Sequence, residues 1–279
     1  QMYLSLLRQI LKDGTKRMTR NAITLSLFNK EISFNVSKSF PLLTTKKMFW
    51  KGIVEELLFF IRGETNTKKL EEKKVNIWKG NTSKEFLDKL NLDYEEGNMG
   101  PMYGYQWRFF NKPIDDDTGG IDQLKNLIEL IKNDPHSRRL LLTDFNPSQV
   151  DQGVLYPCHS LILQFYVENK FLSVKMYQRS ADVFLGLPFN IASTSLLLYI
   201  VAKLSNLEPN NVSISLGDTH IYQDHIEAVE EQLSRNCLIL PKLEIPDFKT
   251  LEEVEKSTFQ DYKIIDYISG SSIKAEMIA

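Results

Sequence analysis

Cysteine is scarce in this chain of 279 residues, which contains only Cys158 and Cys237. Two cysteines form one bridge at most, which excludes a disulfide-rich secreted scaffold. A reducing compartment is therefore expected, and the cytoplasm or the nucleus fits this expectation. The four histidines do not fall with cysteine or acidic residues at the spacing of a metal site, so we predict no bound metal.

The sequence also lacks long apolar runs, linkers and a strong charge of one sign. No apolar stretch approaches the roughly 18 residues of a membrane-spanning helix, and no signal peptide is recognisable. We find no repeat and no segment rich in proline, glycine and serine, which predicts one domain over residues 1–279. A net charge of −2 argues against a nucleic-acid or membrane-surface binder.

The apolar pattern predicts a mixture of helices and strands. Helical spacing predicts helices over residues 2–11, 48–61, 83–92, 121–133, 191–204 and 221–235. Alternation predicts strands over 22–34 with a turn near Asn29, and over 140–145, 160–167, 171–177 and 212–216. Because the two types do not alternate as regular βαβ units, we predict an α+β fold with helices on a mostly antiparallel sheet.

Cys158 is the strongest candidate for chemistry. It follows Pro157, with Arg138 and Arg139 about twenty residues before it and Arg179 about twenty after it. Guanidinium groups lower the pKa of a thiol and bind phosphates through paired hydrogen bonds. A buried structural thiol is the plainer alternative. The clustering favours a nucleophile beside a phosphate site, and hence an enzyme acting on a phosphorylated small molecule.

His159 does not complete this nucleophile as a base. Neighbouring residues on a strand point to opposite faces, which disfavours a Cys158–His159 pair.

Glu55 and Glu56 interrupt a helix that is apolar on almost every side. Two interpretations are open. One carboxylate lies at the exposed edge of the helix, or one is buried, which is costly without a partner or a function. A buried carboxyl would have a raised pKa suited to proton transfer near neutral pH.

Three polar residues follow ordered segments and could contact a ligand. Asn190 precedes a predicted buried helix, where it is either the N-cap or an amide that reads a base edge. His220 and Tyr222 lie between a predicted strand and a predicted helix. Hydrogen bonding to a substrate hydroxyl suits this pair better than metal binding.

Taken together, these motifs resemble thymidylate synthase of the folate-dependent type. The similarity runs from about residue 3 to residue 279. The segments that carry it are 40–47 (FPLLTTKK), 56–66 (ELLFFIRGETN), 100–108 (GPMYGYQWR), 137–139 (SRR), 157–159 (PCH), 177–182 (YQRSAD), 185–193 (LGLPFNIAS) and 217–222 (GDTHIY).

The resemblance implies a thymidylate synthase-like α+β fold whose sheet forms the interface of a homodimer. It also implies a reaction in which dUMP and 5,10-methylenetetrahydrofolate give dTMP and dihydrofolate. Cys158 would attack C6 of the pyrimidine and make C5 nucleophilic. C5 would capture the one-carbon unit of the folate and lose its proton, and hydride transfer would complete the methyl group.

The same resemblance assigns roles to individual residues. Glu56 would organise waters for proton transfer, Tyr103 would assist removal of the C5 proton, and Asn190 would read uracil; Asp182 joins Cys158 in the catalytic set. The dUMP site would comprise Arg20, Arg138 and Arg139 from the partner subunit, Gln178, Arg179, Ser180, Asn190, His220 and Tyr222. The folate site would comprise Lys46 near the glutamate tail, Ile77, Trp78, Asn81, Asp182, Leu185, Gly186, Phe189 and Ala279.

Three departures from the family pattern affect the expected site. The phosphate loop around Arg20 is one residue shorter and lacks glycines. Phe59 and Phe145 stand where tryptophans are usual, which loses two indole N–H donors. The chain ends in Ala279 where valine or isoleucine is usual. These changes bear on rate more than on reaction type.

Alternative functions remain open at this point. A dCMP hydroxymethylase shares the fold, but it would match cytosine with aspartate at position 190, where this chain has Asn190. A nucleic-acid regulator with a vestigial site is disfavoured by the intact Cys158 and by the acidic charge balance. A cysteine hydrolase would need a base and an orienting group at Cys158. Family members occur alone or fused after dihydrofolate reductase, and either arrangement is compatible with a chain that begins at Gln1.

Overall fold

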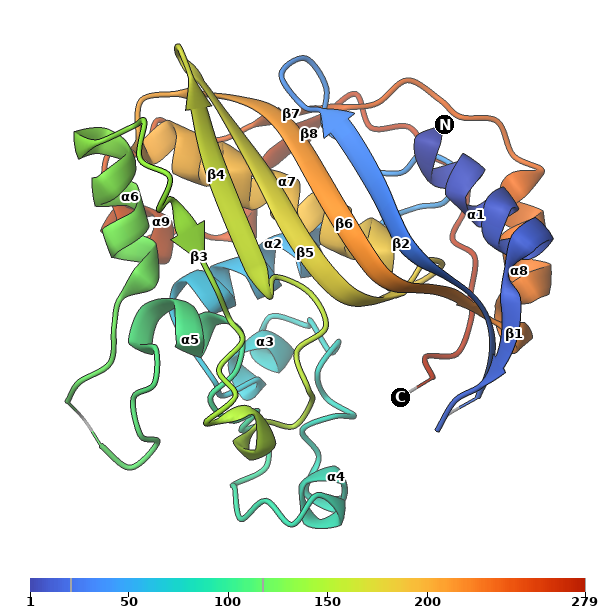
Figure 1. The fold of residues 1–279 in the computed structure, drawn as a ribbon, viewed down its shortest axis with the longest axis horizontal. Helices are drawn as coiled ribbons and strands as arrows, with labels where there is room; N and C mark the ends of the chain where they lie inside the picture. The colour runs from blue at the N-terminus through green and yellow to red at the C-terminus, as the bar shows by residue number, and fades with distance from the viewer. Residues whose placement is uncertain (21, 117, 279) are drawn as a thin grey trace.

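A six-stranded sheet is the centre of the fold. The computed structural model describes residues 1–20, 22–116 and 118–278. The strands run in the order β1-β2-β6-β5-β4-β3 (Figure 1), and every neighbouring pair is antiparallel except β5 and β6. The mostly antiparallel sheet and the α+β class are therefore confirmed. The strands are β1 (Thr15–Met18), β2 (Ile23–Asn35), β3 (Leu141–Leu142), β4 (Ile162–Glu168), β5 (Phe171–Asp182) and β6 (Glu208–Tyr222).

Helices cover one face of this sheet, with α7 and α2 lying behind it in Figure 1. The helices are α1 (Met2–Asp13), α2 (Trp50–Ile61), α3 (Lys68–Glu72), α4 (Lys84–Lys89), α5 (Gly104–Phe109), α6 (Gln123–Asn133), α7 (Gly186–Leu204), α8 (Ile226–Leu233) and α9 (Leu251–Lys256). Short 3₁₀ turns are η1 (Val150–Gln152), η2 (Gln223–His225) and η3 (Phe259–Asp261), and a small hairpin pairs β7 (Lys242–Glu244) with β8 (Lys263–Ile265).

The core lies between the sheet and the two apolar helices α2 and α7. Residues 52–61 of α2 are all buried, and α7 packs on β5 and β6. By length and composition α7 could cross a membrane, but 83% of that stretch is buried inside the fold. An all-round apolar helix of this kind is typical of a core helix.

Three elements extend further than the sequence predicts, and one of them is strand β5, which continues past residue 177 to Asp182. Helix α7 begins at Gly186 rather than near residue 191, so Asn190 lies inside the helix and the N-cap interpretation is wrong. Pro188 does not prevent this, because N–H groups in the first turn of a helix have no intrahelical partner.

Strand β6 continues through His220 and Tyr222, where we expected the start of a helix. The strand persists because it pairs with β2 on one side and β5 on the other. Gly217 allows the close approach: a Cβ there would lie 2.5 Å from the carbonyl oxygen of Arg179. The predicted helix over 221–235 is accordingly shortened to η2 and α8.

Two predicted strands also differ from the structure. Strand β2 does not turn at Asn29, which adopts a φ of 59° within a continuous strand. The predicted strand over 140–145 is reduced to Leu141 and Leu142.

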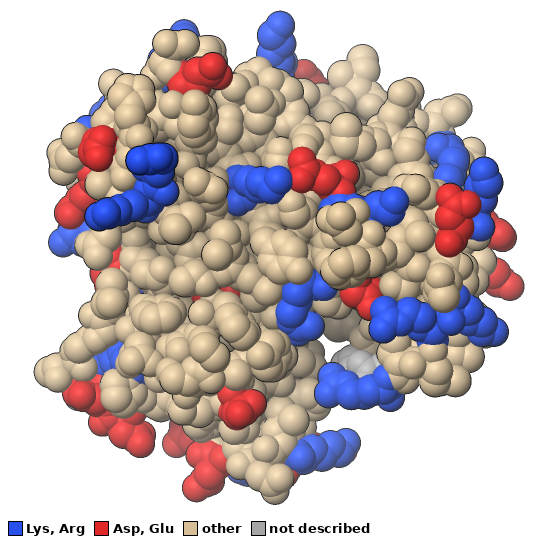
Figure 2. All heavy atoms as spheres, viewed as in Figure 1, with Lys and Arg blue, Asp and Glu red and all other residues tan. Residues whose placement is uncertain are grey.

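The front face of the sheet carries exposed apolar side chains. Residues of β4 alternate between exposed and buried, and its exposed positions include Ile162 and Tyr166. Tyr177 of β5 pairs with Ile162, and Leu141 of β3 is exposed beside them. Uncharged side chains make up most of this face in Figure 2.

We predict that stability depends on α7 far more than on exposed apolar residues. Ile200 of α7 is 1% exposed and Ile239 is 89% exposed. Ile200→Ala should lower the free energy of unfolding by about 2–5 kcal/mol because it leaves a cavity. The matched control Ile239→Ala should change it by less than about 0.5 kcal/mol. Urea unfolding followed by circular dichroism measures both, and equal effects would contradict the assignment of α7 to the core.

Candidate active site

Cys158 lies in a loop that is fixed to strand β5. The backbone N–H of Arg179 donates to the carbonyl oxygen of Cys158 over 2.9 Å. The Arg179 guanidinium donates from Nε to Pro157 O at 2.6 Å and from Nη2 to Tyr156 O at 2.7 Å. This confirms the expected proximity of Cys158 and Arg179, and it holds a cationic group against the nucleophile loop.

Tyr103 is the polar neighbour of the thiol. Its hydroxyl lies 3.7 Å from Cys158 Sγ and accepts a 3.4 Å hydrogen bond from the backbone N–H of Cys158. Desolvation raises the pKa of Cys158, whereas the Tyr103 hydrogen bond and the charge of Arg179 act to lower it. Within a single chain the net direction is upward, opposite to the one expected from the arginines in the sequence, because burial outweighs one guanidinium.

Tyr103 is held rigidly in its place. Its ring stacks on Phe60 of α2 at 5.0 Å and on His159 at 4.5 Å between ring centroids. Its backbone has a φ of 48°, a strained conformation for a residue with a bulky side chain. The next residue, Gly104, packs so closely on α2 that a Cβ would lie 2.1 Å from Phe60 O. The crossing of α5 and α2 therefore positions the Tyr103 hydroxyl.

His159 is a packing residue rather than a base for the thiol. Its ring contacts Tyr103, and its Nδ1 lies 3.0 Å from Ser160 Oγ. Desolvation lowers the pKa of His159 to about 4. The imidazole is neutral at physiological pH, in agreement with the sequence argument against a Cys158–His159 pair.

Glu56 is the buried acid that the sequence left as one of two alternatives. It is 6% exposed, and its Oε2 accepts a 2.7 Å hydrogen bond from Trp78 Nε1. Desolvation raises its pKa to about 7 despite that hydrogen bond. Trp78 also meets the Tyr103 ring edge-on at 6.0 Å, so Glu56 and Cys158 belong to one connected site.

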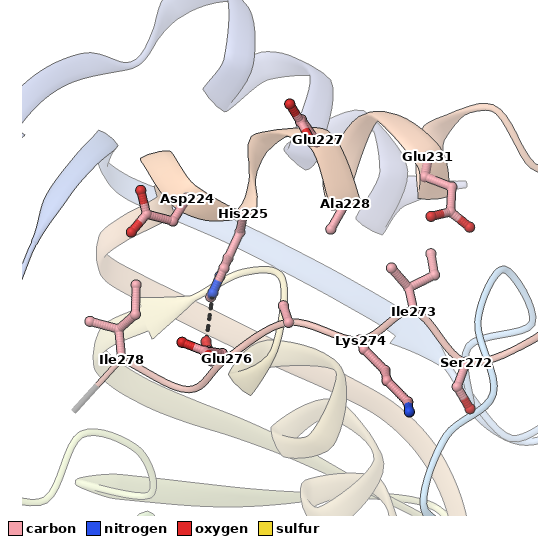
Figure 3. A pocket seen from close by; sticks show the side chains of 11 residues that line it. Asp224, His225, Glu227, Ala228, Glu231, Ser272, Ile273, Lys274, Glu276 and Ile278 are labelled. Atoms are coloured by element: carbon pink, nitrogen blue, oxygen red, sulfur yellow. Dashed lines mark hydrogen bonds between the residues drawn. The ribbon is translucent and has the colours of Figure 1, made fainter.

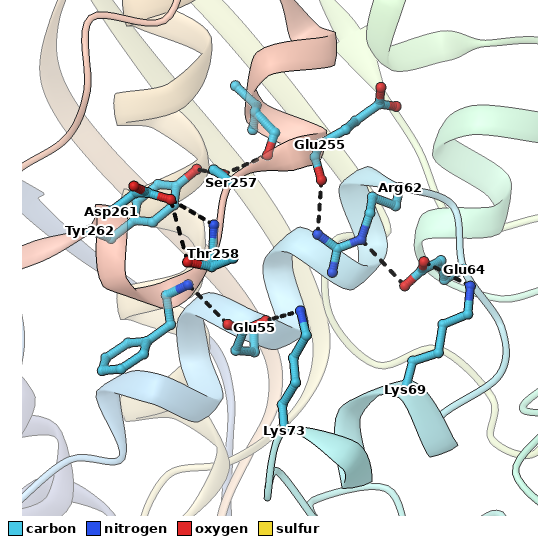
Figure 4. Close-up of polar contacts among 12 residues, drawn as sticks. Glu55, Arg62, Glu64, Lys69, Lys73, Glu255, Ser257, Thr258, Asp261 and Tyr262 are labelled. Carbon is cyan, nitrogen blue, oxygen red and sulfur yellow. Dashed lines mark hydrogen bonds and ion pairs between the residues drawn. The ribbon is translucent and has the colours of Figure 1, made fainter.

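Glu55 is buried as well, but it is an ion-paired structural residue. It accepts from Lys73 Nζ at 2.8 Å and from the backbone N–H of Phe259 at 2.9 Å. Figure 4 shows this pair beside a second group in which Arg62 donates to the Glu255 carbonyl and pairs with Glu64. These contacts fasten the C-terminal part of the chain to α2.

The parallel pairing of β5 and β6 assembles the polar part of the site. Ser180 lies opposite Asp218, and Asp182 lies opposite His220. His220 Nδ1 is 3.0 Å from Asp218 Oδ1, and the His220 ring meets Tyr222 edge-on at 5.2 Å. Asp218 was not among the predicted site residues, although it lies two positions before His220 and orients its imidazole.

Tyr222 connects this group to Arg20 and Cys158. Desolvation raises the pKa of Tyr222, with smaller contributions from Asp182 and Asp218, and the charge of exposed Arg20 opposes the shift. The charge of Cys158 acts on the same hydroxyl. Arg20 and Cys158 thus both act on Tyr222 through their charges rather than through a recorded contact.

Gln178 and Asn190 form an amide pair at the start of α7. Gln178 Nε2 donates to Asn190 Oδ1 at 3.0 Å and to Ser180 O at 3.1 Å. Asp182 Oδ1 accepts from the backbone N–H groups of Phe184 and Leu185. These bonds orient the Asn190 amide.

The predicted folate residues border this amide pair and the Glu56 hydrogen bond. A Cβ on Gly186 would lie 3.7 Å from Asp182 Cβ and 4.0 Å from Asn190 Oδ1. The remaining members are Ile77, Asn81, Leu185 and Phe189, which are partly exposed, and Trp78, which is buried.

Three predicted residues, Lys46, Arg138 and Arg139, make no recorded contact with Cys158. Lys46 is turned inward: its Nζ donates to Phe184 O at 2.6 Å and lies 3.9 Å from the centre of that ring. Desolvation lowers its pKa to about 8. Arg138 and Arg139 are exposed, and their side chains make no hydrogen bond or ion pair with the described residues. Ala279 lies outside the described residues, as does Asn21 next to Arg20.

The C-terminal segment approaches the site along α8 (Figure 3). His225 Nε2 lies 2.7 Å from the carbonyl oxygen of Glu276, and the His225 ring is 5.6 Å from that of Tyr222. A cavity of about 520 Å³ separates α8 from residues 272–278. The segment thus ends close to the Tyr222 side of the site.

Asp144 is a buried residue that the sequence analysis missed. It is 1% exposed, and neither carboxylate oxygen has a hydrogen-bond partner among the described residues. The signal was available, because a carboxylate interrupts the apolar segment 140–145 in the same way that Glu55 and Glu56 interrupt α2.

Known proteins are similar in sequence to this chain over its whole length. A family model described as thymidylate synthase matches residues 1–279. The chain belongs to the thymidylate synthase family. It is 44% identical over 296 residues to a thymidylate synthase of Mycoplasma pneumoniae, with 99% of each chain covered. It is also 44% identical to a thymidylate synthase of human herpesvirus 8, over 99% of this chain and 83% of that protein.

Some relatives are longer. The chain is 45% identical over 282 residues to a bifunctional dihydrofolate reductase-thymidylate synthase of Zea mays, covering 99% of this chain and 54% of that protein. It thus spans about half the length of that bifunctional relative. Membership of the family confirms the resemblance seen in the sequence. Among the described residues, no group of histidine, cysteine and acidic side chains could hold a metal ion.

We predict that Trp78 sets the protonation of Glu56. Trp78→Phe removes a hydrogen bond to the carboxylate, which disfavours the charged form, so the pKa of Glu56 should rise above about 7. Carbon-13 NMR of labelled glutamate measures the titration. Trp107→Phe is the matched control, because the buried Trp107 Nε1 has no hydrogen-bond partner among the described residues. A pKa that Trp78→Phe leaves unchanged would contradict the proposed bond.

The same shift has a consequence for stability. Folded Glu56 keeps a proton that the unfolded chain releases near its ordinary pKa of 4.5. The free energy of unfolding should therefore fall as pH rises from 4.5 to about 7. Glu56→Gln should remove this part of the slope in urea unfolding.

Proposed function

We propose that this protein catalyses the reductive methylation of dUMP to dTMP, with 5,10-methylenetetrahydrofolate as the one-carbon and hydride donor. The observation that carries the proposal is the convergence of a Tyr103-bonded Cys158, a buried Glu56 with a pKa of about 7 and the Gln178–Asn190 amide pair. Reaction at a pyrimidine C5 needs a nucleophile, a proton carrier and a base reader, and these groups supply them.

Cys158 is the covalent catalyst. Attack of its sulfur on C6 of the pyrimidine turns C5 into the carbon of an enolate, which can accept the one-carbon unit. The Tyr103 hydrogen bond and the charge of Arg179 act to lower the pKa of the thiol, against the rise that desolvation causes. The Tyr103 hydroxyl, 3.7 Å from Sγ, is also placed to take part in removal of the C5 proton.

Glu56 carries protons on the uracil O4 and folate side of the site. A carboxyl with a pKa of about 7 is present in both protonation states near neutral pH, which suits a group that must give and take a proton. Glu56 is hydrogen-bonded to Trp78, which belongs to the proposed folate site. Methylenetetrahydrofolate would lie there against Ile77, Asn81, Leu185, Gly186 and Phe189.

Asn190 favours uracil over cytosine. Its amide can accept from N3–H and donate to O4, whereas the corresponding edge of cytosine offers an acceptor at N3 and a donor at N4. Gln178 supports this orientation by donating to Asn190 Oδ1. His220 and Tyr222 would hold the ribose 3′-hydroxyl, and Arg20, Arg179 and Ser180 would bind the phosphate. A dCMP hydroxymethylase is the weaker candidate on this ground.

The active assembly is a homodimer across the front face of the sheet. The exposed Leu141, Ile162, Tyr166 and Tyr177 form an apolar surface that a second copy could cover. Arg138 and Arg139 would then enter the partner's site and add the positive charge that one chain lacks at Cys158.

The proposal has three further parts. Residues 1–279 form one synthase domain. Bifunctional relatives support a fused or associated dihydrofolate reductase, which would consume the dihydrofolate produced. The cytoplasm or nucleus remains the proposed compartment.

The decisive test is turnover with and without the nucleophile. The protein with dUMP and methylenetetrahydrofolate should form dihydrofolate, followed by absorbance, and with dCMP in a parallel cuvette it should not. Cys158→Ala should abolish turnover yet weaken dUMP binding by no more than about tenfold, or about 1.4 kcal/mol, since Arg179 and Asn190 remain. Cys237→Ser is the matched control, because Cys237 is exposed. Turnover in Cys158→Ala would refute the covalent mechanism.

The dimer is tested by mixing two inactive variants. We expect Cys158→Ala and the double variant Arg138→Ala/Arg139→Ala each to lack activity. After subunit exchange, about one quarter of the sites should recover, because half of the dimers are mixed and each has one intact site. Mixtures that stay inactive although exchange is demonstrated would show that the arginines do not serve a partner's site.

A further inference from the structure

Asp144 is a buried carboxyl with no role in the proposed reaction. It follows β3 and is 1% exposed, and neither of its oxygens is hydrogen-bonded among the described residues. A buried polar group without a partner is costly and requires an explanation.

The position of Asp144 relates it to the nucleophile. It lines a small cavity of about 10 Å³, close to the least volume that one water needs. Met102 and Pro157 line the same cavity, and they directly precede Tyr103 and Cys158. The amide side chains of Gln106, Asn146 and Gln149 complete its polar lining. The cavity therefore lies beneath the two segments that form the Tyr103–Cys158 contact.

The charges around Asp144 disfavour its ionisation. Burial raises the pKa of Asp144 well above its usual range, and its own backbone amide opposes the rise only in part. Its titratable neighbours are Tyr103 and Cys158, and a negative charge on Asp144 would raise the pKa of both. His159, which stacks on Tyr103, is neutral, and Arg179 acts on Cys158. A negative charge on Asp144 therefore disfavours the thiolate form of Cys158, and a Cys158 thiolate disfavours ionisation of Asp144.

We propose that Asp144 is a positioning residue for Cys158: it stays protonated, holds one water in the cavity beneath the Tyr103–Cys158 contact, and suppresses the thiolate when it ionises. The proposal rests on the proposed role of Cys158 as nucleophile. It adds a group that does not touch the substrate and that lowers the reactivity of the Cys158 thiol at alkaline pH.

The first test is alkylation of the thiol by iodoacetamide, which needs no turnover. Cys237→Ser leaves Cys158 as the sole thiol of the chain, and Asp144→Asn is added to that background. At neutral pH the two proteins should react at equal rates. At alkaline pH the Asp144→Asn protein should react about threefold faster or more, the effect of about half a pKa unit. Asp151→Asn, an exposed carboxyl on the same segment, is the matched control.

Two results would overturn the proposal. Equal alkylation rates at every pH would show that Asp144 does not act on the thiol. A faster Asp144→Asn protein already at neutral pH would show that Asp144 is ionised there. Either result leaves the synthase assay unaffected, so a failure of this inference is distinguishable from a failure of the proposed function.

Infrared spectroscopy detects the protonated carboxyl of Asp144 directly. In a Glu56→Gln background, which removes the other buried acid with a raised pKa, a protonated carboxyl band should be present at neutral pH and absent after Asp144→Asn. Carboxylate bands alone would overturn the proposal. If Asp144→Asn does not fold, Asp144→Ser replaces it, and loss of the band between neutral and alkaline pH in the Glu56→Gln protein with Asp144 intact gives the same answer. A crystal structure should show one water against Asp144, and an empty cavity would refute the water.

Discussion

The site depends on one close contact between strands, the parallel pairing of β5 with β6. At Gly217 the β6 backbone passes so near Arg179 O that a side chain could not fit. Because the pairing continues beyond this point, Ser180 and Asp182 face Asp218 and His220. The same strand end carries Arg179, whose backbone N–H holds the Cys158 loop. A larger residue at 217 would separate the polar group from the nucleophile.

Helix α2 shows how one buried segment serves stability and chemistry with adjacent residues. Glu55 has a lysine ammonium and a backbone N–H as partners. Within the described part of the chain, Glu56 has only an indole N–H, which does not compensate for desolvation, and its pKa rises to about 7. The difference between a structural and a reactive carboxylate lies in the number and charge of the donors around it.

Chemistry was easier to predict from this sequence than the ends of elements. Cys158 and Glu56 stand out in the sequence because a thiol among arginines and a carboxylate in an apolar helix are unusual whatever the fold. The start of α7 was missed because Gly186 and Pro188 usually end helices, and the end of β6 because Gly217-Asp218 has the composition of a turn. In both cases tertiary contacts outweigh local preference. Asp144 was overlooked although its carboxylate interrupts an apolar segment of the sequence, whereas its position beside Met102 and Pro157, which are distant in the chain, is visible only in the fold. The roles proposed for Arg138 and Arg139 require a second copy, so the structure of one chain does not test them.

The Arg179 guanidinium also limits which changes the site can tolerate. It donates from Nε to Pro157 O and from Nη2 to Tyr156 O, so the proposed phosphate contact would fall to its remaining N–H groups. Under that proposal, one planar side chain would hold the Cys158 loop and the substrate at the same time. Lysine carries the same charge, but its single ammonium cannot span both directions. At position 179 the planar shape of the cation therefore matters as much as its charge, and a substitution that preserves charge alone would uncouple substrate binding from placement of the thiol.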